Sequence, residues 1–262
     1  MIIKGKGYFD LKKIYESGQV LIGWDAREDG SFAVTSTDKT AICTQKGKDV
    51  VIDCPKEDEK FWKNYFDLKT DYAAFEAAAE GDDYLKEALD YGRGIRILRQ
   101  EIWEALFSFI VSQNNNIPRI TKSLRKIKGD CPVLKRPEEM YPEREMLRDC
   151  GLGYRDDYLI NLLEELNAGT KTLKFSEDTE KAYAELTAIR GVGPKVANCV
   201  LLFGLHRMER CPVDTWMRKV FDLHYDNKAP EWVCSPNAGY YQQVTFFYER
   251  TAASKKESKN KG

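Results

Sequence analysis

A glycine-rich turn between two helical segments carries the residues best suited to chemistry. The segment Ile189–Lys195 reads I-R-G-V-G-P-K, with Pro194 at a first helical position. Gly191 and Gly193 permit positive φ and carry no Cβ, so backbone amides around Val192 can converge on an anion at the start of the second helix. This pattern indicates a helix–hairpin–helix that holds a DNA phosphate without reading sequence. It is equally compatible with a tight turn whose glycines serve geometry alone.

Two side chains near this turn could act on a sugar. Lys195 opens the second helix, where packing and the positive end of the helix dipole favour a neutral amine that can form a Schiff base with a sugar C1′. Asp214 follows Pro212 and Val213 where another helix should begin, and its carboxylate could stabilise oxocarbenium charge as a glycosidic bond breaks. The apolar stretch between them can form a buried helix that returns the chain, so that both face one cleft. The alternatives are a solvated or phosphate-contacting lysine and a simple N-cap aspartate.

The elements that must position these residues change in type along the chain. Short β-branched or aromatic runs separated by turn signals predict three or four antiparallel strands, at 20–24, 31–34, 40–43 and 50–52. From about residue 57 the spacing of apolar residues is helical, with helices expected at 102–110, 117–127, 156–168, 177–190, 195–205, 214–224 and 237–250. The predicted fold class is α+β, with a small N-terminal antiparallel β-sheet domain and a mostly α-helical body. We assign the sheet and its following helices to 1–90, the catalytic body to 91–253 and a disordered tail to 254–262.

Composition bounds the class of protein only loosely. With 262 residues, 42% hydrophobic and 32% charged, the chain reads as a globular protein of one or two domains. A run long enough to span a bilayer and a signal-peptide stretch are both missing from the sequence, which favours an intracellular protein. The net charge of −1 taken alone argues against a nucleic-acid binder, yet residues 1–90 sum to −6 and the remainder to +5. Seven irregularly spaced cysteines without a C-x-x-C pair favour neither a disulfide framework nor a zinc or iron–sulfur site.

The motifs together resemble a known family. G-V-G-P-K-V-A at 191–197 followed by P-V-D at 212–214 resembles the helix–hairpin–helix DNA glycosylase superfamily, in which the lysine marks members that are both glycosylase and abasic-site lyase. S-Q-N-N-N-I-P-R-I at 112–120, G-L-G-Y-R at 151–155 and S-G-Q at 17–19 resemble stretches of the 8-oxoguanine DNA glycosylases. The resemblance runs from about residue 10 to residue 250.

The resemblance implies a pocket for an extruded base. Such enzymes take the damaged guanine out of the duplex, because its C1′ is otherwise unreachable. Gly18 would offer its carbonyl to the N7–H that distinguishes 8-oxoguanine from guanine, and Gln242 would bind the Watson–Crick edge. Phe246 and Cys199 would sandwich the ring, although without the family both read as helical core.

The resemblance also implies contacts to DNA outside this pocket. Asn114, Arg119 and Arg155 would contact the orphaned cytosine, and Tyr154 would wedge beside it. The amides of the hairpin residues Gly191, Val192 and Gly193 would hold a phosphate. The alternatives without the family are a helix C-cap and turn for the asparagines, and a phosphate contact for Arg155. One departure is Trp216, which stands where animal and fungal members usually carry a phosphate-holding histidine.

These features predict a bifunctional 8-oxoguanine DNA glycosylase and abasic-site lyase that acts on duplex DNA, preferably opposite cytosine. We expect a monomer that needs no metal or cofactor, and a bacterial or archaeal cytoplasmic setting near the nucleoid rather than a nuclear one. Two alternatives stay open at this point. One is a non-enzymatic helix–hairpin–helix DNA-binding module, and the other is a glycosylase for another damaged base, against which Lys195 argues.

Overall fold

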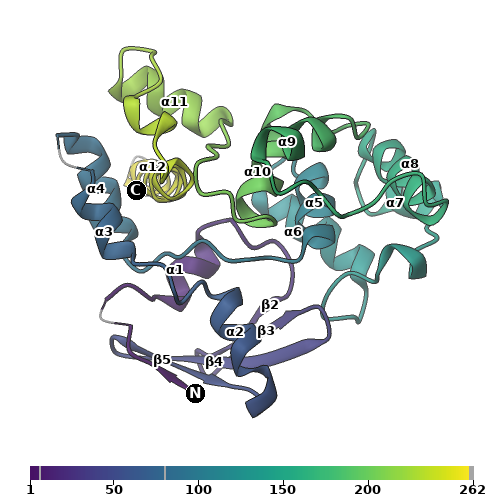
Figure 1. Ribbon diagram of the computed structural model, residues 1–262, viewed down its shortest axis with the longest axis horizontal. Coiled ribbons are helices and arrows are strands. Elements are labelled where there is room, and N and C mark those ends of the chain that lie inside the picture. The colour runs from purple at the N-terminus through teal and green to yellow at the C-terminus, as the bar shows by residue number, and fades with distance from the viewer. Residues whose placement is uncertain (6, 80, 260–262) are drawn as a thin grey trace.

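A five-stranded antiparallel sheet forms the N-terminal part of the protein. The computed structural model describes residues 1–5, 7–79 and 81–259. The strands follow the order β1-β5-β4-β3-β2, and the helices lie on one side of the sheet (Figure 1). They are β1 (Ile2–Ile3), β2 (Trp24–Ala26), β3 (Phe32–Ser36), β4 (Lys39–Lys46) and β5 (Asp49–Asp53). The predicted α+β fold class is confirmed by this sheet and the helices that follow.

Helices make up most of the remaining chain. The α-helices are α1 (Leu11–Glu16), α2 (Glu59–Tyr65), α3 (Tyr72–Ala77), α4 (Asp83–Gly92), α5 (Ile102–Val111), α6 (Ile117–Lys128), α7 (Arg144–Asp149), α8 (Arg155–Asn167), α9 (Thr179–Thr187), α10 (Pro194–Phe203), α11 (Thr215–His224) and α12 (Ala238–Lys259). Short 3-10 turns lie at η1 (Lys56–Asp58), η2 (Pro137–Glu139) and η3 (Glu231–Cys234).

Side chains alternate between the two faces of the sheet along each strand, and the apolar ones lie on the face that is buried. In β3, Phe32 and Val34 are buried, and the register places them opposite Cys43 and Ala41 of β4, which are also buried. Helices α1 and α2 cover this face, and α2 contributes the fully buried Trp62. A small sheet with one apolar face needs such a cover, so these elements share a compact core of their own.

A second and larger core lies among the helices. Helix α5 is buried at every position from Trp103 to Val111, and it packs against α6, α8 and α10. Helix α12 packs against α4 and α11 on the other side of the body (Figure 1). Tyr72 of α3 and Leu85 of α4 belong to this larger core, although the sequence assigns both helices to the N-terminal domain. The two cores interleave along the chain, because Leu21 belongs to the larger core and Leu98 belongs to the core of the sheet.

The structure differs from the sequence-based expectations at several elements. Of the strand expected at 20–24 only Trp24 lies in a strand, because the preceding residues turn around Gly23, whose carbonyl accepts from Thr35 N at 2.7 Å. Strand β1 was not predicted, since two residues are too few to display a period. Helix α12 continues to Lys259 where the sequence predicts a disordered tail, because alanine, lysine and glutamate readily extend an established helix. The last three residues of that tail lie outside the described residues.

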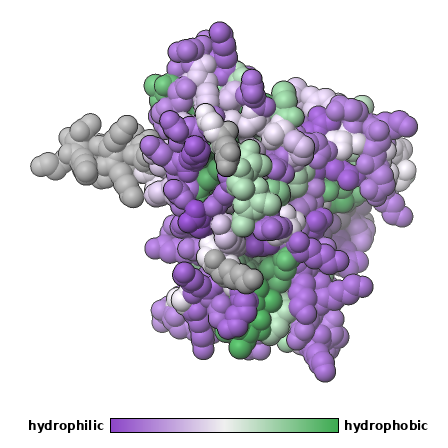
Figure 2. Space-filling view, turned by 60° about the vertical axis from the view of Figure 1, so that its left-hand side comes forward, coloured by the Kyte–Doolittle hydropathy of each residue, from purple (hydrophilic) through white to green (hydrophobic). Residues whose placement is uncertain are grey.

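The surface is largely polar. Figure 2 shows hydrophilic residues over most of the visible face, with hydrophobic residues gathered in a band down its middle. Among the helices described, none combines the length and apolar character needed to cross a membrane.

Candidate active site

The glycine-rich turn forms a helix–hairpin–helix between α9 and α10. Gly191 has φ +85°, a conformation that favours glycine, and a Cβ at this position would lie 2.3 Å from the ring of Tyr158. Pro194 occupies the first turn of α10, where its missing N–H costs nothing. The Val192 amide donates to Ile189 O at 3.0 Å, so it is already used within the turn. In the part of the chain that is described, the Gly193 amide has no protein acceptor.

Lys195 lies at the start of α10 and points toward the end of α5. Its Nζ donates to Ser112 Oγ at 2.9 Å and lies 5.4 Å from the centroid of the Phe109 ring. One turn later Cys199 is buried, and burial raises the pKa of its thiol to about 11 even though the Lys195 charge acts in the opposite direction. The thiol is therefore neutral near pH 7 and presents an uncharged, polarisable surface.

Asp214 is the N-cap of α11. Its Oδ1 accepts from Met217 N at 2.9 Å, which satisfies one of the unpaired amides of the first turn. Burial raises the pKa of this carboxyl, whereas the amide hydrogen bonds and the Lys195 charge act to lower it. The two candidate catalytic groups thus influence each other through space, while the hydrogen bond of Lys195 goes to Ser112. A partly desolvated carboxylate beside an amine can stabilise positive charge that develops between them.

Residues from the two ends of the chain meet at Gly18. Its φ is +84°, and a Cβ there would lie 2.9 Å from Ile117 Cδ1 and 3.2 Å from Phe246 Cε1. Helix α12 is fastened to this turn because Gln243 Nε2 donates to Ser17 O at 2.8 Å. These contacts leave no room for a side chain at position 18, so its backbone can approach whatever binds beside Phe246.

Gln242 brings an unused acceptor into the interior. The side chain is 5% exposed, and its Oε1 is buried without a hydrogen-bond partner in the described part of the chain. A buried unsatisfied acceptor is costly, which is typical of a position that a ligand completes.

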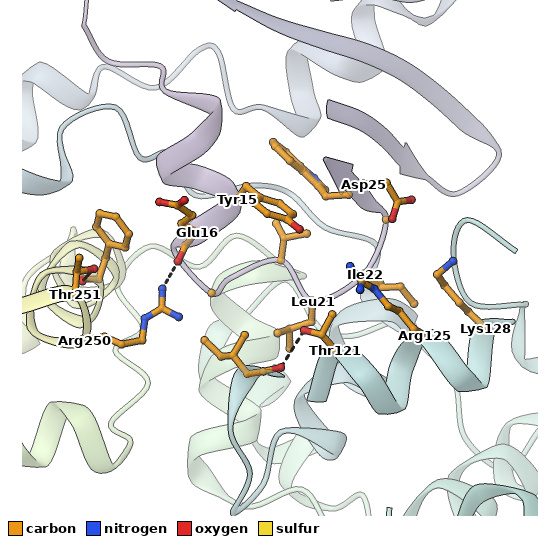
Figure 3. Close-up of a pocket in the computed structure, with 16 residues that line it drawn as sticks. Tyr15, Glu16, Leu21, Ile22, Asp25, Thr121, Arg125, Lys128, Arg250 and Thr251 are labelled. Atoms are coloured by element: carbon orange, nitrogen blue, oxygen red, sulfur yellow. Dashed lines mark hydrogen bonds between the residues drawn. The ribbon is translucent and has the colours of Figure 1, made fainter. Parts of the chain in front are cut away.

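A cavity of about 420 Å³ is lined in part by Gly18 and lies between α6, α12 and residues 20–25. Figure 3 shows Arg125 and Lys128 reaching along its wall from α6, and Arg250 at the opposite end bonded to the Glu16 carbonyl. Neither Lys195 nor Asp214 lines it, so this cavity does not contain the candidate catalytic pair.

The loop after α5 and the turn before α8 lie together. Asn114 has φ +44°, and its Nδ2 donates to the hydroxyl of Tyr154 at 3.1 Å. Tyr154 is 49% exposed, which is unusual for a large aromatic side chain. Asn116 caps α6 by accepting from Arg119 N, and the Arg119 guanidinium donates to Gly151 O at 3.2 Å. The exposed ring, the amide and the guanidinium therefore form one polar surface.

Known proteins with this architecture are repair enzymes. The solved structure of the 8-oxoguanine glycosylase/lyase of Clostridium acetobutylicum, in complex with double-stranded DNA containing cytosine opposite 8-oxoguanine, is 30% identical with a TM-score of 0.87 and covers 94% of this chain and 93% of that one. A family model described as the N-terminal domain of 8-oxoguanine DNA glycosylase matches residues 1–106. The chain belongs to the 8-oxoguanine DNA glycosylase/lyase family.

Curated relatives of the family agree with this assignment. The probable N-glycosylase/DNA lyase of Methanothermobacter thermautotrophicus is 28% identical, and the match covers 82% of each chain. The N-glycosylase/DNA lyase of Saccharomyces cerevisiae is 34% identical over 52% of this chain, and the match spans 43% of the yeast protein's length. The resemblance inferred from the motifs is thereby confirmed at the level of the family.

The structure gives Arg155 a different position from the one expected for a residue that reaches an orphaned base. The guanidinium is 4% exposed, and its nitrogens donate to the carbonyls of Gln113, Leu152 and Asn114. Its carbon lies 4.6 Å from the centroid of the Tyr154 ring. Arg155 holds the loop and the aromatic ring in place, because its donors are engaged by backbone oxygens.

Two residues of the site carried no separate sequence signal. Ser112 accepts the hydrogen bond of Lys195, and Gln113 Nε2 donates to Gly191 O at 2.9 Å, which ties the loop after α5 to the hairpin. Both belong to the S-Q-N-N-N-I-P-R-I motif, but no role was predicted for either side chain. The half-buried Trp216 lies two residues after the Asp214 cap. The centroid of its ring lies 5.1 Å from Lys219 Nζ.

Proposed function

We propose that the protein removes 8-oxoguanine from duplex DNA in base-excision repair and then cleaves the strand at the resulting abasic site. The observation that carries the proposal is Lys195, which opens α10 next to the hairpin, is oriented by Ser112 and lies within electrostatic reach of Asp214. The membership of the family supports it, since relatives bear the name N-glycosylase/DNA lyase. The partner is double-stranded DNA that contains the oxidised base, as in the complex solved for the bacterial relative.

In the proposed mechanism, Lys195 Nζ first gives up its ammonium proton to solvent and then attacks C1′ while the C1′–N9 bond breaks. The base leaves with the bonding pair and takes up a proton released from Nζ. The Ser112 oxygen accepts from the amine and orients it, and the Asp214 carboxylate stabilises positive charge on the sugar. Opening of the sugar ring gives an imine between Nζ and C1′. Loss of a C2′ proton then expels the 3′ phosphate, which is β-elimination.

Recognition of the base is proposed to use the two ends of the chain. The Gly18 carbonyl would accept the N7–H of 8-oxoguanine, a position where guanine itself presents an acceptor. The unpartnered Gln242 Oε1 would accept from a donor on the Watson–Crick edge, which would satisfy an otherwise orphaned buried oxygen. Phe246 and the neutral Cys199 would pack on the two ring faces.

Discrimination of the opposite base is proposed to lie on the surface formed by the loop and the turn. Arg119 and Asn114 would contact the orphaned cytosine, and Tyr154 would wedge into the space left in the stack. Arg155 would reach the cytosine only after giving up its backbone carbonyls, so its first role is to hold Asn114 and Tyr154. Phosphate contacts are proposed for the hairpin at Gly191 and Gly193, with the Val192 amide remaining inside the turn.

Borohydride trapping tests the lysine assignment. Wild-type protein incubated with an 8-oxoguanine·C duplex and sodium borohydride should yield a covalent protein–DNA adduct, because the reagent reduces the imine. Lys195→Gln should give none while still binding the duplex, and Lys174→Gln, an exposed lysine in the segment before α9, should trap as the wild type does. An adduct that persists in Lys195→Gln would overturn the assignment.

A panel of duplexes separates the alternatives. Excision of 8-oxoguanine but not of 3-methyladenine or thymine glycol supports the proposal, whereas lesion-independent binding without turnover supports a simple DNA-binding module. Pairing 8-oxoguanine with C, A, G and T measures the role of Arg119 in the choice of opposite base. We also propose a bacterial or archaeal cytoplasmic setting, in line with the archaeal and bacterial relatives.

A further inference from the structure

One face of α6 is densely basic. The helix sequence I-P-R-I-T-K-S-L-R-K-I-K contains no carboxylate, and Ile120, Ser123 and Leu124 are its buried residues. The basic residues lie on the remaining circumference of the helix: Arg119, Lys122, Arg125, Lys126 and Lys128. A half-circumference of one sign produces a positive potential over the whole length of the helix.

The basic residues of α6 lack carboxylate partners. On the neighbouring helix α7, by contrast, Arg148 pairs with Asp156 at 2.7 Å. Within the described residues, no cation of α6 lies within 4.0 Å of a carboxylate oxygen. Arg119 and Lys126 donate instead to backbone carbonyls of the 149–151 segment, at 3.2 and 3.1 Å. The charge of this face is therefore available to an external anion.

The position of α6 indicates which anion. The helix begins at the Asn116 cap, and its first turn carries Arg119, the residue proposed to contact the orphaned base. At a rise of about 1.5 Å per residue, Lys126 lies roughly 10 Å farther along the axis than Arg119. One DNA strand presents a phosphate about every 3.4 Å of duplex axis, so this length matches about three phosphates.

We propose that Lys122, Arg125 and Lys126 bind phosphates of the strand opposite the damaged base, beyond the orphaned nucleotide. Lys122, Arg125 and Lys126 are exposed and line a shallow groove along the outside of α6. Lys128 is left out because, unlike the exposed Lys126, it is half-buried where its Nζ donates to Cys131 O at 2.6 Å. The proposal rests on the proposed function, which places Arg119 beside that strand.

The salt dependence of duplex binding tests this surface. Dissociation constants of the full chain are measured between about 50 and 200 mM salt, for a duplex that carries one uncleavable abasic-site analogue opposite cytosine. For the variant Lys122→Gln/Arg125→Gln/Lys126→Gln, the slope of log K against log[salt] should fall in magnitude by about 0.9 per lost phosphate contact, at most about 2.7. At about 0.1 M salt each lost contact then weakens binding by about eightfold.

A matched triple variant controls for total charge. Lys46, Lys48 and Lys56 are exposed lysines in the N-terminal sheet and the turn after it, without an ion pair in the described part of the chain. Their replacement by glutamine should leave the slope at the wild-type value. Urea denaturation of both triple variants establishes that each is folded, and Lys122→Gln alone should show about a third of the effect.

Two duplexes shortened in the opposite strand, one on each side of the orphaned base, assign the strand. One of them should bind the wild type with the reduced slope of the α6 variant. An α6 variant whose slope equals that of the wild type, or a wild type insensitive to both truncations, overturns the proposal. These measurements record binding to an uncleavable duplex, so a wild type that fails to excise 8-oxoguanine would refute the proposed function and leave the α6 result standing.

Discussion

Replacing Gly191 by alanine should damage the hairpin through two separate costs. At φ +85° an L-residue pays about 1–2 kcal/mol relative to glycine. The new methyl would also lie 2.3 Å from Cγ and 2.4 Å from Cδ2 of Tyr158, and relieving such an overlap in a packed region costs about 1–3 kcal/mol. Gly191→Ala should therefore lose about 2–5 kcal/mol of the free energy of unfolding.

The neighbouring glycine provides the control, because it lies in the same turn but differs in both backbone conformation and surroundings. Gly193 has φ −90° and ψ −180°, an extended conformation that alanine adopts before a proline, and a Cβ there meets nothing within 4 Å. Gly193→Ala should change stability by less than about 1 kcal/mol, in the stabilising direction. Its methyl would nevertheless stand where a phosphate is proposed to approach, so duplex affinity should fall.

Urea denaturation of the three proteins, followed by tryptophan fluorescence, measures the difference. Equal losses for Gly191→Ala and Gly193→Ala would refute the reasoning, since they would mean that neither φ nor the Tyr158 ring governs the turn. A destabilised Gly193→Ala with unchanged duplex affinity would contradict the phosphate assignment of the hairpin.

Three further variants test other parts of the molecule. Burial alone would raise the pKa of Asp67, but hydrogen bonding and the charge of His206 hold it at about 2. The folded state therefore loses about 2 kcal/mol of stability as the pH falls from about 4 through 2. Asp67→Asn should flatten this part of the plot of urea-denaturation stability against pH. Burial raises the pKa of Glu104 to about 8, so the folded state loses stability as the pH rises from about 4.5 to 8. In buffers above pH 8, Glu104→Gln should raise the urea concentration at the unfolding midpoint, and at pH 4 it should not. An equal shift at both pH values would contradict the assignment. Tyr154→Ala removes an exposed ring whose hydroxyl accepts a hydrogen bond from Asn114. The free energy of unfolding should change by less than about 0.5 kcal/mol, while excision should slow about tenfold or more in single-turnover assays. An unchanged rate would exclude the role of Tyr154 as a wedge.

Local signals predicted much of the fold. The helices around Lys195 and Asp214 follow from apolar periodicity, from Pro194 at the start of α10 and from an aspartate cap on α11. These signals are short-range, because a helix period and a cap depend on a few neighbouring residues. The same holds for the glycine at 191, whose positive φ is a property of the turn itself.

Contacts between distant segments could not be predicted from the sequence. The need for glycine at 191 comes as much from Tyr158, a residue of another helix, as from the backbone. Arg155 sits in a motif associated with base contact, yet tertiary packing buries it against carbonyls of the loop after α5. Asp67 and His206 form a buried pair from segments far apart in the chain, and neither has a local pattern that announces the other. Burial of charge is decided by the final packing, which periodicity does not encode.

The fastening of α12 to the turn at Gly18 has a consequence for biosynthesis. The bond from Gln243 to Ser17 joins residues 226 positions apart, and Phe246 packs beside the same turn. During translation the sheet and the hairpin lysine emerge well before α12, and contacts of such long sequence separation form late. The proposed pocket for the base is thus completed by α12, which leaves the ribosome after the hairpin. A nascent chain that does not yet contain α12 carries the reactive amine without the walls proposed to select its substrate.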